Sequence, residues 1–273
     1  MDLKKCGIVA ILLFLIRERL STGILTGLPA LSAAKKNDGG DIRNSTFSNY
    51  AGKEQTDFLP AITNSLTPGT GAFKSIPQAD GSFVDMRGNW GGYTLDLSLL
   101  WGHFIKEPHT SAYTKGKAGD GRLDYTAYIP FRIFPAPEAL RAKDNIKIAL
   151  LVDRHSVSCS ELSVMTVKTM PGRENHRVFG ETSYGATSPL NDTRSYIMYD
   201  GGITKPVNPI FWNRIYTPFY AVKCADGNRY EGIRIAPDEP IISDNAYWTA
   251  FAAGQDKRLE AAIKWIDPSK TFP

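Results

Sequence analysis

The sequence predicts an α/β fold with a largely parallel sheet, because it contains two strand–turn–helix units. The first unit has strand residues at 82–86, a glycine-rich turn at 87–92 and leucines at helical spacing over 93–104. The second has a short apolar run at 146–152, typical of a buried strand, and a helical pattern from about Cys159 to Met170. Two such units favour an α/β domain over an all-β or all-helical one.

The remaining elements are shorter. Residues 107–137 are rich in Gly, Pro and Tyr and predict an irregular excursion over the surface. Further strands are predicted at 177–179, 196–199 and 217–224. The pair Asp226-Gly227 is a strong hairpin signal and joins the last of these to a strand over 229–235. An amphipathic helix from about Asp256 closes the chain.

The N-terminus resembles a secretory signal. Lys4-Lys5 precede an apolar run at 7–16, and small residues follow at 30–34. The sequence therefore predicts a signal-like or anchor leader over 1–34, a linker over 35–81 and the main domain over 82–273. Charges at 17–19 are awkward for a cleaved signal, so a buried helix or an uncleaved membrane anchor stays open. The expected location is extracytoplasmic: periplasmic, secreted or membrane-anchored.

Composition excludes several function classes. A net charge of +4 without a long Lys/Arg run is not the footprint of a nucleic-acid binder. Three cysteines without CxxC or HxxxH spacing predict no metal site and no disulfide framework. Neither GxGxxG nor GK[ST] occurs, so no dinucleotide or phosphate loop is expected, and no cofactor is predicted.

The turn at 156–161 joins the buried strand to the helix. A hydroxyl there lies beside helix N–H groups that have no helical partner and carry the positive end of the helix dipole. That environment suits an oxyanion and therefore a nucleophilic Ser158. Ser158 followed by Glu161 is also a capping box, which closes a helix without doing chemistry. This stretch alone leaves both interpretations open.

The glycine turn also has two interpretations. Gly91 and Gly92 let the backbone approach a ligand and point N–H groups at it. Equally, an isolated GNxGG could serve only to make a tight turn.

Four segments, in this order, resemble peptidase family S41, the tail-specific or C-terminal processing proteases. They are VDMRGNWGG at 84–92, LLVDRHSVSCSEL at 150–162, FGETSYGAT at 179–187 and YEGIRIAPDEPI at 230–241. The resemblance covers roughly 82–266. It implies that 82–273 is a catalytic domain with a ClpP/crotonase-like core: a mixed, mostly parallel sheet flanked by helices, with a C-terminal β-hairpin and a closing helix.

The resemblance also implies site residues. Ser158 corresponds to the nucleophile, and the Cys159 amide with that of Gly91 or Gly92 corresponds to the oxyanion hole. Ala186 stands where one branch of the family has its lysine base, so the serine–lysine mechanism is not expected. Glu231 corresponds to the glutamate of the Ser–His–Glu branch, where a carboxylate holds the histidine.

The histidine of that branch has no match. It lies before the glycine turn in the family, whereas the first histidine here is His103. His155 is nearest to Ser158 in sequence; His109 and His176 are further away. Family members usually carry a longer N-terminal region, often with a peptide-binding module. The chain is thus a shortened form, receives the histidine from a partner, or no longer cleaves.

Two functions follow from the resemblance. The first is a serine peptidase that hydrolyses polypeptides through an acyl-enzyme on Ser158. The second is a catalytically impaired S41-like protein that binds a peptide or another ligand, since no matching histidine or lysine base is present. A plain structural module would require the four-segment match to be accidental.

Overall fold

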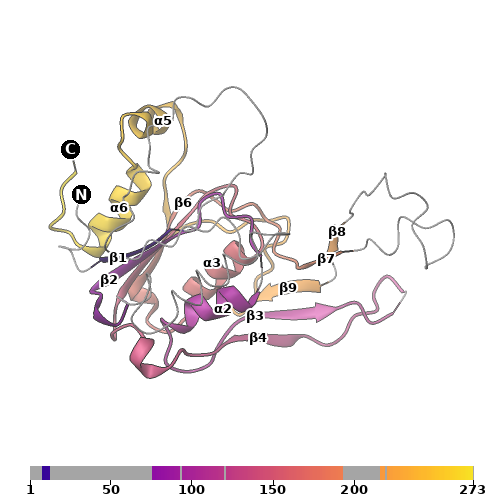
Figure 1. Cartoon of the computed structure of the whole chain (residues 1–273). Coiled ribbons are helices and arrows are strands. Elements are labelled where there is room, and N and C mark those ends of the chain that lie inside the picture. The colour runs from indigo at the N-terminus through magenta and orange to yellow at the C-terminus, as the bar shows by residue number, and fades with distance from the viewer. Residues whose placement is uncertain are drawn as a thin grey trace, which may run out of the picture.

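The centre of the fold is a five-stranded sheet in which every neighbouring pair is parallel (Figure 1). The computed structural model describes residues 8–12, 76–92, 94–119, 121–192, 216–218 and 220–272. In sheet order the strands are β1 (Ile8–Leu12), β2 (Gly81–Asp85), β5 (Lys147–Val152), β6 (His176–Gly180) and β10 (Glu239–Pro240). The predicted α/β class, the mostly parallel sheet and both strand–turn–helix units are confirmed.

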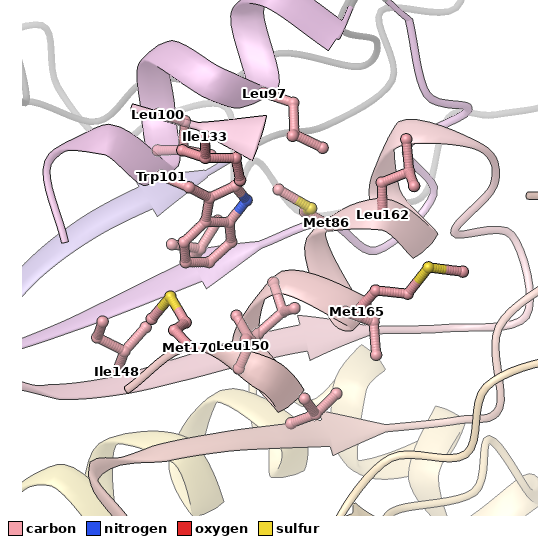
Figure 2. Close-up of a cluster of buried hydrophobic side chains, with 14 of the residues drawn as sticks. Met86, Leu97, Leu100, Trp101, Ile133, Ile148, Leu150, Leu162, Met165 and Met170 are labelled. Atoms are coloured by element: carbon pink, nitrogen blue, oxygen red, sulfur yellow. The ribbon is translucent and has the colours of Figure 1, made fainter. Parts of the chain in front are cut away.

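Helices cover both faces of this sheet, and the alternation of side chains along the strands explains how. On one face, Ile148 and Leu150 join the cluster that holds α2 (Thr94–Gly102) and α3 (Cys159–Thr169). Figure 2 shows Trp101 of α2 within that cluster, and its indole N–H donates to Ser163 Oγ at 2.9 Å. On the other face, Ala149 and Leu151 pack against α6. Strands buried on both faces need the continuous apolar run that the sequence shows.

The closing helix forms as predicted. It is α6 (Lys257–Ile266), its N-cap is Asp256, and it buries Ala262, Ile263 and Ile266. The helix before it, α5 (Asn245–Ala252), was not predicted. Two short 3-10 turns, η5 (Glu138–Leu140) and η6 (Arg173–Asn175), flank β5 and α3.

A second, antiparallel sheet was missed by the sequence prediction. Its order is β4 (Ile129–Ile133), β3 (His109–Gly116) and β9 (Tyr220–Cys224), so 107–137 is a β-ribbon rather than an irregular excursion (Figure 1). One face of it buries Ala112, Ile133, Val222 and Cys224 in the larger core. The glycines and prolines that suggested a loop lie mostly in the connections around the strands.

The predicted C-terminal hairpin forms only in part. The chain turns at Gly227, where the Cys224 amide donates to the Asn228 carbonyl at 2.8 Å, but no strand follows at 229–235. The carbonyl of Tyr230 accepts the amides of Ile233 and Arg234, and this makes a tight turn. The turn carries Glu231 toward the loops described below. A small pair, β7 (Leu190–Asp192) and β8 (Tyr216–Pro218), precedes β9; the strand predicted at 196–199 lies outside the described residues.

Within the N-terminal apolar run, Ile8–Leu12 forms the edge strand β1, parallel to β2. The rest of 1–34 and residues 35–75 lie outside the described residues, so the leader and linker stay predictions. Among the residues that are described, no helix is both long and apolar enough to cross a bilayer.

A buried histidine makes stability depend on pH. Burial, and then the charge of Arg173, lower the pKa of His176 from 6.5 to about 4, and its Nδ1 lacks a hydrogen-bond partner in the described part of the chain. Because the folded state binds this proton less tightly, the stabilisation is present above pH 6.5 and is lost as the pH falls through 4. We expect a loss of up to about 3 kcal/mol over that range.

Urea unfolding at several pH values measures this effect. In His176→Gln, stability should fall less steeply between pH 6.5 and 4 than in the wild type. Equal slopes in both proteins would contradict the assignment.

Candidate active site

Three loops meet at the carboxyl ends of β2, β5 and β6, which lie at one edge of the parallel sheet. The amide of Val157, after β5, donates to the carbonyl of Asn89, after β2, at 2.9 Å. The amide of Ser158 donates to the carbonyl of Ala186, after β6, at 3.0 Å. This edge is where open α/β sheets bind ligands. Three of the four segments that carry the family resemblance therefore come together around Ser158.

The backbone of Ser158 is strained. Its φ of 57° and ψ of −115° lie outside the β region that an N-cap residue normally occupies. The N-caps Asp244 (φ −88°) and Asp256 (φ −92°) of the same chain have ordinary geometry. Such a conformation costs about 1–3 kcal/mol in a residue with a side chain. A cap does not need this strain, and the nucleophilic serine of α/β-hydrolases lies on a strained strand-to-helix turn of this kind.

The capping interpretation of Glu161 is also correct, but its carboxylate does more than cap. One oxygen accepts the amide of Ser158 at 3.2 Å and that of Ala186 at 2.8 Å. The other accepts Ser183 Oγ at 2.6 Å and the amide of Gly185 at 2.7 Å. Burial raises the pKa of Glu161, and these four hydrogen bonds oppose the shift. The carboxylate thus fixes the loop after β6 against the serine turn.

Gly91 lies in contact with Ser158. A Cβ on Gly91 would come within 2.5 Å of Ser158 Cβ and 2.9 Å of the Cys159 nitrogen, and its φ is +92°. Only glycine allows this approach. The Gly91 amide donates to Asn89 Oδ1 at 2.8 Å, and Ser160 Oγ donates to the same oxygen at 2.6 Å. Of the two glycines proposed for the oxyanion hole, this geometry favours Gly92, while Gly91 provides close approach.

Cys159 is the first residue of α3 and is buried. Its thiol donates to the carbonyl of Gly92 at 3.0 Å, so the helix start and the glycine turn are joined directly. The two backbone segments predicted to supply oxyanion donors are therefore neighbours.

Glu231 lies on the turn after β9 and contacts the loop after β6. Its Oε2 accepts the amides of Thr187 and Ser188, each at 2.8 Å, and the Thr187 hydroxyl at 3.0 Å. The Ala186–Thr187 peptide thus contacts Ser158 through its carbonyl and Glu231 through its N–H. Because these groups point in opposite directions in a trans peptide, Glu231 and Ser158 lie on opposite sides of one peptide unit.

The family model for peptidase family S41 matches residues 40–240, most of the chain. The chain belongs to peptidase family S41. A comparison with curated protein sequences gave no match.

Solved structures share the fold. One, from Parabacteroides merdae ATCC 43184 and classed provisionally as a peptidase, is 21% identical with a TM-score of 0.56, over 83% of this chain and 62% of its own. Mature CPAF is 11% identical with a TM-score of 0.57, over 84% and 51%. A protein of Bacteroides fragilis NCTC 9343, classed provisionally as an S41 protease, is 15% identical with a TM-score of 0.53, over 84% and 54%. This S41 chain thus spans about half to two-thirds of those structures.

No histidine is found at the S41 site in the described residues, which include all four histidines of the sequence. His103 Nδ1 bonds to the Leu140 carbonyl at 2.8 Å, and His109 Nε2 bonds to a threonine of α3 at 3.0 Å. His176 is buried on β6, and His155 is exposed on the serine turn. No hydrogen bond joins any of them to Ser158 or Glu231. The sequence thus matches no residue to the general base of the expected triad, and none of the described residues supplies one.

The described residues also contain no cluster of three or more His, Cys, Asp or Glu side chains placed as metal ligands would be.

Proposed function

We propose that this S41 chain is a serine peptidase that hydrolyses polypeptides through an acyl-enzyme on Ser158. The strained backbone of Ser158 carries the proposal, because helix capping does not require it. The hydroxyl would attack the scissile carbonyl, and the oxyanion would form beside the amides of Cys159 and Gly92. The hydroxyl proton would pass to an imidazole supplied by a partner, and from it to the departing amine; water would then release the acyl group.

Glu231 has the features of the triad carboxylate in the Ser–His–Glu branch. Three donors occupy its Oε2, whereas Oε1 has no hydrogen bond within the described part of the chain. That oxygen is available to accept the N–H of an imidazole supplied by a partner, to hold its tautomer and to stabilise the imidazolium.

Exposed apolar side chains on the loops around Ser158 suit an extended polypeptide. Trp90 is 60% exposed, Tyr184 is 55% exposed and Ile233 is 71% exposed. Along the sequence, Trp90 and Tyr184 directly precede Gly91 and Gly185. Ile233 is two residues after Glu231. Large exposed apolar groups gathered at a polar site indicate contact with a ligand. We propose that they contact side chains of a polypeptide tail.

A second candidate is an impaired S41 protein that binds peptides without cleaving them. The observation in its favour is that none of the four histidines lies at the site.

Hydrolysis of an unfolded, fluorescently labelled polypeptide separates the two candidates. We expect cleavage by the wild type and none by Ser158→Ala. In Glu231→Gln the rate should fall by at least about a hundredfold. His155→Ala is the matched control, since it removes an exposed imidazole from the same turn and should leave the rate unchanged. Peptide binding without any cleavage would support the second candidate, and cleavage that survives in Ser158→Ala would refute the first.

A further inference from the structure

The solvent side of the antiparallel sheet carries cations stacked on tyrosine rings. Tyr113 lies opposite Lys223 in the β3–β9 register, so both point away from the face that holds Ala112 and Cys224. We name this surface the basic sheet face. Its members are Tyr113, Lys115, Lys117, Tyr125, Tyr128, Lys223 and Arg229.

Each cation lies over at least one ring. Lys115 Nζ is 4.6 Å from the centroid of Tyr125 and 5.2 Å from that of Tyr128. Lys223 Nζ lies 4.9 Å from Tyr128 and 5.3 Å from Tyr113. Stacking of this kind holds long side chains in place through their aliphatic stems and through the ring quadrupole. The positive charges are therefore ordered before any ligand arrives.

These cations form no ion pair within the described part of the chain, in contrast to many others. Lys143, Lys168 and Arg177 each contact a carboxylate at 2.7–2.9 Å. The nearby carboxylates of the basic sheet face have other partners. Asp226 accepts the Tyr230 hydroxyl and the Asn228 amide, and Asp124 accepts the Gly121 amide. The face thus carries four cations, and neither of these two carboxylates forms an ion pair with any of them.

The basic sheet face leads to the proposed active site. Arg229, which lies 6.0 Å from the centroid of Tyr128, is two residues before Glu231. From there the face continues along β3, whose eight residues span roughly 25 Å. A polypeptide held at Ser158 could therefore extend over this face.

We infer that the basic sheet face is an exosite for an acidic segment of the polypeptide substrate; this rests on the proposed function. Carboxylates complement ammonium groups that are already ordered, so binding costs little additional side-chain entropy. Single-stranded nucleic acid is the competing polyanion, but it binds such sheets by stacking bases on free aromatic faces. Here the cations occupy the ring faces, and this favours carboxylates.

Binding is tested in Ser158→Ala, which uncouples it from turnover. The probes are a fluorescein-labelled glutamate-rich peptide and the same peptide with glutamine at each glutamate. We expect the glutamate peptide to bind and the glutamine peptide not to bind. The triple substitution Lys115→Gln/Lys117→Gln/Lys223→Gln should weaken binding by about tenfold or more. The matching Lys→Arg triple should retain it, and added salt should weaken it.

The control triple, Lys106→Gln/Lys143→Gln/Lys257→Gln, removes the same charge from exposed lysines elsewhere and should change little. Equal loss in this control, or equal binding of the glutamine peptide, would overturn the inference. Tighter binding of oligothymidylate that depends on the same lysines would overturn it in favour of a nucleic acid.

The proposed peptidase function is tested independently of the exosite. In the protein with Ser158 intact, the Lys→Gln triple should cleave a short uncharged peptide at the wild-type rate. If the protein cleaved nothing but bound the glutamate peptide through these lysines, the peptidase proposal would be wrong and binding at the basic sheet face would still be supported. Cleavage without lysine-dependent binding of the glutamate peptide would support the peptidase proposal and overturn the exosite.

Discussion

In Gly91→Ala, hydrolysis and labelling of Ser158 should fall by at least about a hundredfold while the protein stays folded. The new Cβ would lie 2.5 Å from Ser158 Cβ and 2.9 Å from the Val157 carbonyl oxygen. Those atoms belong to the strained turn, and the turn must move to relieve the contact. Displacing the hydroxyl and the Cys159 amide together removes both the attack geometry and the oxyanion donor.

Gly254→Ala is the matched control for backbone strain. Gly254 has a φ of +86°, close to the +92° of Gly91, but nothing lies within 4 Å of a Cβ placed there. It should lower stability by about 1 kcal/mol and leave the hydrolysis rate unchanged. A folded Gly91→Ala protein with wild-type labelling would show that the contact between the glycine turn and Ser158 is not functional.

Arg87→Met should destabilise the fold by about 3–5 kcal/mol, the largest effect on stability that we expect. Arg87 is buried and contacts two carboxylates, Asp85 at 2.5 Å and Asp256 at 2.8 Å. Asp85 is fully buried at the end of β2, and Asp256 caps α6. Removing the guanidinium leaves a buried carboxylate uncompensated and detaches the closing helix from the strand that leads into the glycine turn.

Denaturant unfolding measures this loss, and two variants calibrate it. Lys143→Met breaks an exposed pair with Asp80 and should cost less than about 1 kcal/mol. Asp85→Asn combined with Arg87→Met should recover part of the loss, because no charge is left buried. If Arg87→Met cost no more than Lys143→Met, the buried ion pair would not stabilise the closing helix.

The parallel core was predictable from the sequence because its signals are local. The run at 146–152 is apolar apart from Lys147 at its start, as a strand buried on both faces requires. The turns after β2 and β5 carry glycines and a cap that stand out without any knowledge of contacts. These same turns, in this order along the chain, also carry the resemblance to peptidase family S41.

What the sequence could not show depends on partners far along the chain. The strand β3 has the sequence HTSAYTKG, in which polar residues predominate, so its pairing with β9 leaves no periodic apolar signal. The strand expected after Asp226-Gly227 is replaced by the tight turn that the Tyr230 carbonyl closes. Glu161 was recognised only as a cap, because its bonds to the loop after β6 join residues more than twenty positions away.

The most direct test of the central claim is to locate the adduct of a fluorophosphonate probe by peptide mass spectrometry. If Ser158 is a nucleophile held in a strained turn, the folded wild type and His155→Ala should carry the adduct on Ser158. Ser158→Ala and the urea-unfolded wild type should not be labelled at this turn. No adduct on Ser158 at high probe concentration, or equal labelling of folded and unfolded protein, would contradict the account.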